Sequence, residues 1–209
     1  MPPRENAILR VHTNGPIAVA EVRGFLGAFE HAYNSLLYLD YTLDAGERVA
    51  RQSHFPLSSY IWFAPFPFRR TPAPFVGWPP TAQQVASAIL PRDRLVLNAA
   101  EMKSPGYWDF LGKLNPLEVT RQYLQDRHER RKDREYREAA EKRRLDLENT
   151  LLENKVIKER IEIAKNLGAT EEDLAPLLNE LVIKPVRELD RYQDRGAIET
   201  GEIVKGLPS

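Results

Sequence analysis

Four histidines are the first residues to consider for metal binding or acid–base chemistry, because the chain contains no cysteine. His12 and His31 fall in separate predicted elements, a strand and a helix, and His128 lies in a run of charged residues. Together with His54, none of them stands at the spacing of a metal-binding motif. We therefore expect no metal site and no cofactor.

Two pairs of carboxylates, Asp40/Asp44 and Glu171/Glu172, have the residue types that general acid–base catalysis needs. Nothing in the sequence places either pair in a pocket. The motifs of nucleotide-binding loops, serine hydrolases and zinc proteases do not occur. A Ser–His–Asp arrangement assembled in three dimensions stays open, so the sequence favours a non-enzymatic protein without excluding an enzyme.

Basic side chains are concentrated in residues 126–144, where nine Lys and Arg stand among six Asp and Glu. On a helix such side chains could follow the phosphates of a nucleic acid. The candidate contacts are Arg127, Arg130, Arg131 and Arg134. The interleaved acids would repel the same phosphates, and the net charge of the chain is zero, so nucleic-acid binding is the alternative function.

A long helix would position these charges, because opposite charges three or four residues apart stabilise a helix. Residues 117–167 contain neither Gly nor Pro, and Asn115-Pro116 is typical of a helix start. A continuous helix over 116–167 would be roughly 78 Å long, whereas a domain of about 115 residues has a diameter of about 35 Å. The far half of this projecting helix must therefore be buried by C-terminal residues, a second copy or another protein.

Apolar residues recur at three-to-four spacing in that far half, and we favour self-association as the way they are buried. Asn154 falls within one apolar set, where a polar residue can fix the register of pairing. The predicted self-association residues are Leu145, Leu152, Val156, Ile163 and Leu167.

Residues 1–115 form the predicted N-terminal α+β module. Residues 7–13 alternate between apolar and polar as a half-buried strand does, and they end at an Asn-Gly-Pro turn. Apolar residues then repeat at helical spacing up to about residue 39. Gly24 and Gly27 within this helix indicate close packing against a sheet.

Further strands are predicted at residues 57–63 and 94–102, with a short helix capped by Thr81 between them. The second of these strands runs into a Ser-Pro-Gly turn and then into the aromatic residues 107–112. We interpret these as a helix that repeats the first strand–turn–helix unit. The small sheet then has β-α-β-β-α order with its helices on one face.

A proline- and aromatic-rich insert occupies about residues 64–80, and its prolines exclude a packed helix or a central strand. One interpretation is an extended or partly disordered loop that covers an apolar surface. The other is a recognition loop whose aromatic side chains become buried against a partner. The candidate partner-binding residues are Phe66, Phe68, Phe75 and Trp78.

Residues 168–209 form the predicted C-terminal piece. Gly168 is expected to end the long helix, and Thr170 is expected to cap a new helix whose first turn is acidic. Pro185 interrupts the apolar pattern. We therefore expect a short helical hairpin, followed by a tail with little power to form a core.

Residues 104–138, SPGYWDFLGKLNPLEVTRQYLQDRHERRKDREYRE, resemble a stretch of an uncharacterised bacterial protein family. The shared features are a strand, an SPG turn, an aromatic helix and a charged helical arm. The resemblance implies a bacterial protein of this plan and attaches no activity to it, so no functional residue is carried over.

These observations together predict an α+β protein with a long projecting helix and a short C-terminal helical hairpin. No apolar stretch reaches the length of a membrane span or a signal peptide, so we expect a cytoplasmic protein without membrane insertion. Our prediction is a non-enzymatic, self-associating adaptor or scaffold. The long helix would form the homo-oligomer, and the N-terminal module would bind a heterologous protein partner.

Overall fold

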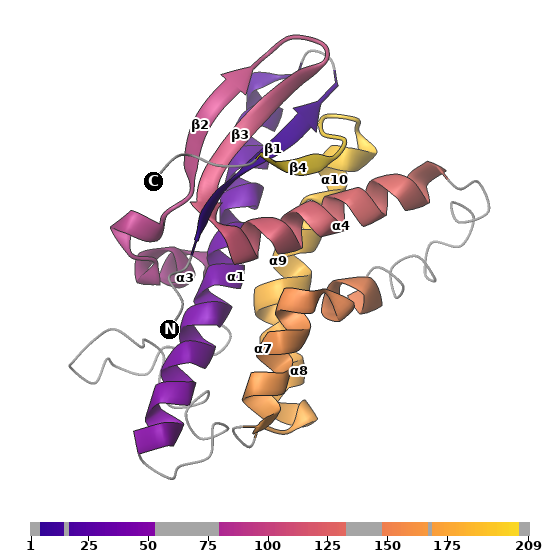
Figure 1. Ribbon diagram of the computed structural model, residues 1–209. Coiled ribbons are helices and arrows are strands. Elements are labelled where there is room, and N and C mark those ends of the chain that lie inside the picture. The colour runs from indigo at the N-terminus through magenta and orange to yellow at the C-terminus, as the bar shows by residue number, and fades with distance from the viewer. Residues whose placement is uncertain (1–4, 15–16, 53–79, 133–147, 167–168, 205–209) are drawn as a thin grey trace.

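A computed structural model gives the fold as helices packed against one antiparallel sheet, which confirms the α+β class (Figure 1). The residues that it describes are 5–14, 17–52, 80–132, 148–166 and 169–204. The elements in chain order are β1 (Asn6–Thr13), α1 (Val19–Gln52), α3 (Ala82–Ala88), η1 (Pro91–Asp93), β2 (Val96–Glu101), β3 (Gly106–Lys113), α4 (Leu114–Lys132), α7 (Lys155–Asn166), α8 (Glu171–Leu178), η2 (Asn179–Ile183), α9 (Lys184–Arg187), α10 (Asp190–Asp194) and β4 (Gly201–Val204).

The sheet has strand order β2-β3-β1-β4, and every neighbouring pair is antiparallel. β1 lies in the interior of the sheet, between β3 and β4. Its alternation follows the sequence pattern, with Leu9, Val11 and Thr13 buried on the helix side and Arg10 and His12 on the other side. The helices therefore cover one face of the sheet, and β2 and β4 form its two edges.

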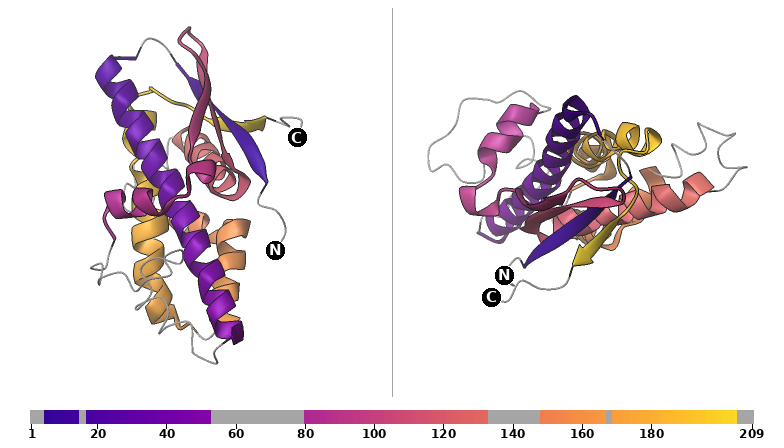
Figure 2. Two further views of the ribbon diagram at one scale, coloured as in Figure 1. Left: turned by 90° about the vertical axis from the view of Figure 1, so that its left-hand side faces the viewer. Right: turned by 90° about the horizontal axis from the view of Figure 1, so that it is seen from above.

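α1 crosses the covered face of the sheet as the longest helix of the described chain (Figures 1 and 2). Phe25 lies 4.9 Å from Trp108 between ring centroids, and Phe29 stacks on Phe110 at 4.2 Å. The helix continues past its expected end, and all of residues 32–45 are buried. α1 is thus the central helix of a core to which the sheet and the C-terminal helices both contribute.

Residues 106–113 form strand β3, so the aromatic helix predicted there is wrong, and so is the repeat of a strand–turn–helix unit. Trp108 lies opposite Val11 and Phe110 opposite Leu9, which places both aromatic rings in the core. Gly112 packs under the ring of Tyr33, where an added Cβ would lie 2.7 Å from a ring carbon. Pairing with β1 along the whole strand therefore decides the structure, and local aromatic spacing does not.

The single straight helix predicted over 116–167 is also wrong, because the chain turns back on itself. α4 ends at Lys132, residues 148–153 are helical, and a bend at Asn154 precedes α7. The amide of Asn154 donates to Gln122 Oε1 at 2.6 Å, and Arg130 Nη2 donates to Thr150 Oγ1 at 2.6 Å. These contacts join α4 to the returning segment side by side.

The C-terminal helices run back along α1 and end in a strand that the sequence did not predict. Thr170 caps α8 through a capping box with Asp173, as expected from the sequence. Pro185 is accommodated by the wide turn η2, in which the N–H of Lys184 donates to the carbonyl of Asn179. β4 then pairs with β1, so the expected tail contributes an edge of the sheet.

Candidate functional site

The apolar residues predicted for self-association lie largely against the molecule's own core. Leu152 and Val156 are partly buried and pack against the hydrophobic core, and Ile163 is half-buried. Leu145 and Leu167 lie outside the described residues. Because α7 contacts α1 and α4, packing within one chain competes with the predicted self-interface, whose role in assembly stays a prediction.

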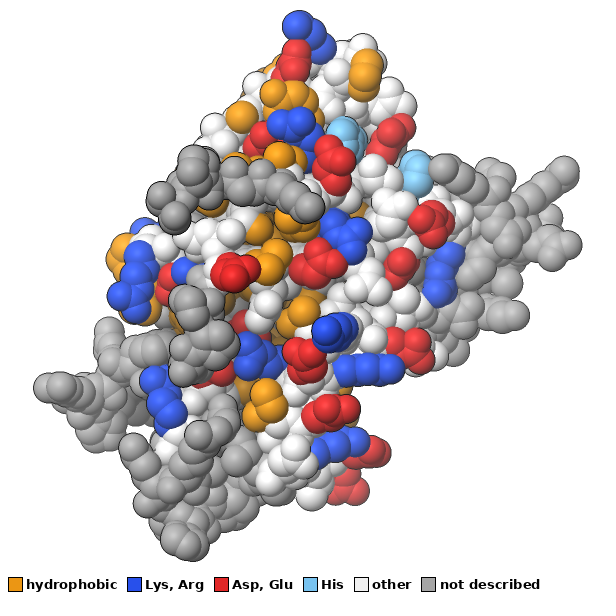
Figure 3. Space-filling view, in the orientation of Figure 1, with side chains coloured by type: hydrophobic (Ala, Val, Ile, Leu, Met, Phe, Trp, Pro, Cys, Tyr) orange, Lys and Arg blue, Asp and Glu red, His pale blue; other side chains and the backbone are white. Residues whose placement is uncertain are grey.

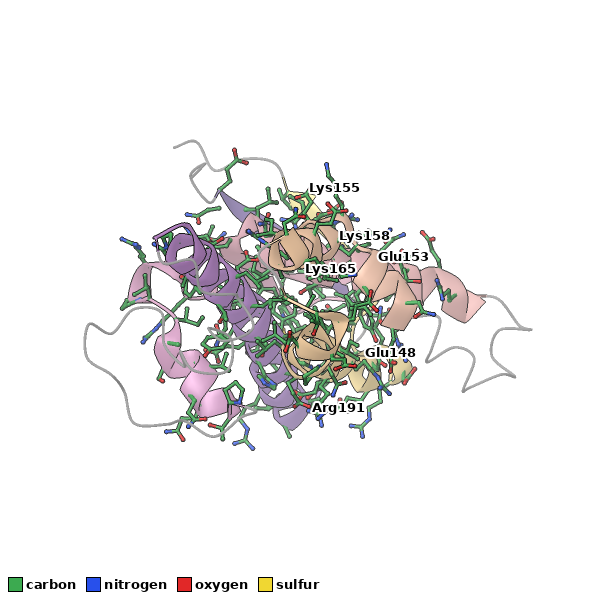
Figure 4. All side chains as sticks on the ribbon, turned by 90° about the horizontal axis from the view of Figure 1, so that it is seen from below. Glu148, Glu153, Lys155, Lys158, Lys165 and Arg191 are labelled. Carbon is green, nitrogen blue, oxygen red and sulfur yellow. The ribbon has the colours of Figure 1, made fainter. Side chains whose placement is uncertain are left out.

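The outward face of α7 carries exposed charges of both signs (Figure 4). Lys155 lies 3.9 Å from Glu159, and Lys165 lies 2.8 Å from Glu171. Lys158 is exposed between them. Exposed pairs of this kind contribute little to binding or stability, and this face is best described as solvated.

The four aromatic residues predicted to bind a partner lie outside the part of the chain that the structure describes. They are Phe66, Phe68, Phe75 and Trp78. The recognition loop and the covering loop therefore both stay predictions, as does the strand at residues 57–63.

Arg127, the first of the predicted nucleic-acid contacts, is buried and ion-paired within the chain, which competes with phosphate binding, and its role in nucleic-acid binding stays a prediction. Its Nε lies 2.9 Å from Asp190 Oδ1, and its Nη2 lies 2.8 Å from Asp194 Oδ1. Arg130 donates to Thr150 in the helical turn-back described above. The Arg131 side chain and all of Arg134 lie outside the described residues.

Arg127 is the centre of a polar network that joins α4 to α10. Tyr123 donates its hydroxyl to Asp190 at 2.6 Å, and Gln193 donates to the carbonyls of Leu124 and Glu199. Burial raises the pKa of Asp190, although Arg127 beside it favours the ionised form. Burial, together with the Asp190 carboxylate, also raises the pKa of Tyr123 well above its usual value. The network therefore holds the C-terminal helices on α4.

The carboxylates of Asp40 and Asp44, the pair noted as a potential acid–base site, are both ion-paired with Arg160 of α7. Arg160 Nε lies 2.9 Å from Asp40, and its Nη1 lies 3.2 Å from Asp44. Both acids are at least 95% buried. A single guanidinium thus joins α7 to α1 at the point where α1 is buried on all sides.

Asp93 forms a third buried centre, between η1, α1 and the end of β3. Its carboxylate accepts a hydrogen bond from the Tyr41 hydroxyl and lies 3.1 Å from Lys113 Nζ. Burial disfavours its charge, but the Tyr41 hydrogen bond and the Lys113 ammonium outweigh burial and lower the pKa of Asp93. Tyr33 donates to the Asp93 carbonyl at 2.8 Å, which fixes η1 to α1.

A depression between α4 and the residues that return at the bend is too narrow to hold a bound molecule. Asp126 lies at its rim, and burial raises the pKa of this acid. Among the described residues, no group of three or more His, Asp or Glu could hold a metal ion. The residues that line the depression are Val119, Gln122, Tyr123, Asp126, Thr150, Leu151 and Asn154.

The face of the sheet opposite α1 is organised in rows that run across the strands. Pairing aligns one apolar row, made by Val204, Ile8, Leu111 and Val96. The next row is charged, and in it Arg10 forms two 2.8 Å hydrogen bonds to Asp109 and lies over the Tyr107 ring at 4.0 Å. Figure 3 shows this mixture of apolar and charged side chains in its upper part.

β2 is the edge strand at which this face ends, and it exposes more apolar surface than any other described strand. Val96 is 50% exposed and Leu97 46%, and Met102, which directly follows the strand, is 58% exposed. A bulge lies between Leu97 and Ala99 in the pairing with β3. Among the described residues no strand pairs with the outer edge of β2, so its outward backbone groups can accept a further strand.

Comparisons with known proteins find no relative for this chain. No protein-family model, no curated protein and no solved structure matches it. The resemblance noted for residues 104–138 therefore stays a prediction. Within the described part of the chain, no helix combines the length and the apolar composition that crossing a membrane requires.

Proposed function

We propose that the protein is a non-enzymatic, self-associating adaptor or scaffold that assembles through the outer edge of β2. The observation that carries this proposal is the half-exposed apolar side chains of Val96 and Leu97 on a strand whose outer edge has no partner strand among the described residues. An edge strand of this kind is a template for pairing with another chain, and proteins usually protect it with Lys or Pro. Residues 96–101 contain neither, and the bulge between Leu97 and Ala99 is the one device of this kind within β2.

The charged groups in the interior favour a structural role over a catalytic one. Arg127, Arg160 and Asp93 each pair with opposite charges from another element, and each pair joins two parts of the fold. We place assembly at β2 and not on the long helical segment, because the apolar residues of α7 pack against α1. The N-terminal module remains the proposed site for a heterologous protein partner.

The experiment that tests this proposal is the solution mass of the purified chain, measured by light scattering after size exclusion over a range of protein concentrations. We expect a dimer or a larger assembly that persists at high salt, because strand pairing and apolar burial are only weakly screened. A mass of 24.0 kDa, that of one chain, at every concentration would overturn the proposal.

A further inference from the structure

The two flanks of β2 carry opposite charges. Arg94 precedes the strand in an extended conformation, with φ −67° and ψ 149°, and Glu101 ends it. Arg94 is exposed, and no ion pair joins it to the part of the chain that the structure describes. The carboxylate of Glu101 lies 3.0 Å from Nζ of the exposed Lys103. Arg94 is therefore available to a strand that lies along the outer edge of β2, and Glu101 can exchange its exposed partner Lys103 for such a strand at little cost.

Two identical strands that pair antiparallel can do so in only a few registers, and the charges discriminate among them. One register places Arg94 of each copy opposite Glu101 of the other. A shift by one residue places Arg94 opposite Met102, which removes the attraction. A shift by two residues places it opposite Lys103, and like charges directly opposite each other destabilise a strand pair.

We infer that two copies of this chain pair through β2, antiparallel, with Arg94 of each copy opposite Glu101 of the other. This inference rests on the proposed self-association and gives it an interface. Val96 of each copy then lies opposite Ala99 of the other, which covers the exposed Val96 side chain at both edges. The two sheets join into one continuous sheet with β4 at both ends.

Symmetry favours β2 pairing with β2 over β2 pairing with β4 of another copy. The first arrangement has a two-fold axis and closes as a dimer, whereas the second leaves two edges open and would continue as a filament. β4 is also the shorter strand, with four residues against six, and it exposes Glu202.

A charge-exchange experiment tests this register directly. Arg94→Glu and Glu101→Arg each place like charges opposite each other at both ends of the strand pair. We expect each variant to weaken dimerisation about tenfold, measured by sedimentation equilibrium, because two exposed pairs change from attraction to repulsion. An equimolar mixture of the two variants restores both attractions, so it should form dimers as readily as the natural chain.

Two further variants serve as controls, and a third tests the strand edge itself. Lys158→Glu and Glu162→Arg make the same charge changes on exposed positions of α7 and should leave dimerisation unchanged. Leu97→Lys, which introduces a charge at the pairing edge, should give a monomer with native circular dichroism.

The outcomes separate this inference from the proposed function. If the natural chain is a dimer but neither Arg94→Glu nor Glu101→Arg weakens it, self-association stands and pairing through β2 is overturned. If both variants weaken dimerisation and their equimolar mixture dimerises no more tightly than either variant alone, this register is overturned. A natural chain that stays monomeric at every concentration overturns the proposed function as well.

Discussion

Asn154 donates its side-chain amide to Gln122 at 2.6 Å, although 32 positions separate the two residues in the sequence. In one straight helix the same positions would lie about 48 Å apart. The Asn154 side chain also accepts a hydrogen bond from the N–H of Val156 at 2.9 Å, so it caps the start of α7. A single buried side chain thus ends one helical segment, starts the next and attaches both to α4.

Replacing Asn154 with Ala should lower the free energy of unfolding by about 2–3 kcal/mol, because a cap and a buried hydrogen bond are lost together. Gln122→Ala removes the partner but leaves the cap, and it should cost about 1 kcal/mol. Chemical denaturation monitored by circular dichroism measures both values. Equal losses for the two variants would show that the cap contributes nothing.

Arg127→Met should destabilise the protein by about 2 kcal/mol near neutral pH, because it leaves the half-buried Asp190 without its countercharge. The pKa of Asp190 is already raised by burial, and loss of Arg127 should raise it further. An acid whose pKa is raised in the folded state destabilises the fold when it is ionised. This cost decreases as the pH falls through the raised pKa, because the acid becomes protonated. The loss should therefore be smaller in mildly acidic buffer than at neutral pH.

Arg191→Met is the matched control for this prediction, because it removes an exposed arginine from α10 that lies over the ring of Tyr192. It should change stability by less than about 1 kcal/mol and without dependence on pH. A cost of Arg127→Met that is the same at both pH values would contradict the role assigned to Asp190.

For Asp93 we expect stability to depend on pH with the opposite sign. Its pKa is lowered in the folded protein, so it contributes stability above the ordinary pKa of an aspartate, and this stability is lost as the pH falls toward the lowered value. Asp93→Asn should cost about 2 kcal/mol at neutral pH and should flatten the loss of stability in acid. Denaturant midpoints measured across the acidic range provide the test.

Asp126→Asn is a comparison with the reverse expectation, since burial raises the pKa of Asp126. The ionised Asp126 opposes folding as the pH rises above its ordinary pKa, and the amide removes this effect. Asp126→Asn should therefore remove a decrease in the free energy of unfolding that occurs as the pH rises. Asp93→Asn should instead remove an increase in the free energy of unfolding over the acidic range. If both variants changed the slope of stability against pH in the same direction, the opposite pKa shifts assigned to Asp93 and Asp126 would be refuted.

Elements that local chemistry defines were predictable from the sequence. The alternation around Leu9 and Val11 gave the buried face of β1, and Thr81 and Thr170 cap helices through capping boxes that can be read from neighbouring residues. The strand before Lys103 was also expected. Its place at the edge of the sheet was not, because strand order depends on partners far away in the sequence.

Elements that distant contacts define were missed. Trp108 and Phe110 fit both a helical and an alternating pattern, and only pairing with β1, nearly a hundred positions away, makes them a strand. The bend at Asn154 has no Gly or Pro to mark it, and Gln122 completes it from another helix. The ion pairs of Arg127 and Arg160 likewise join residues whose proximity exists only in the fold.

Gly24 and Gly27 lie about one turn apart on α1, and the structure separates their roles, although close packing against the sheet was predicted for both. A Cβ on Gly24 would meet the Tyr192 hydroxyl at 2.7 Å, whereas a Cβ on Gly27 meets nothing within 4 Å. Gly27→Ala should stabilise the protein by about 0.5–1 kcal/mol, because alanine is the better helix former. Gly24→Ala should destabilise it, because Tyr192 is 96% buried against Phe25 and cannot move aside at low cost. Thermal unfolding of Gly24→Ala with and without Tyr192→Phe decides the cause: removal of the hydroxyl should recover the loss, and no recovery would show that the close approach is not what requires glycine at position 24.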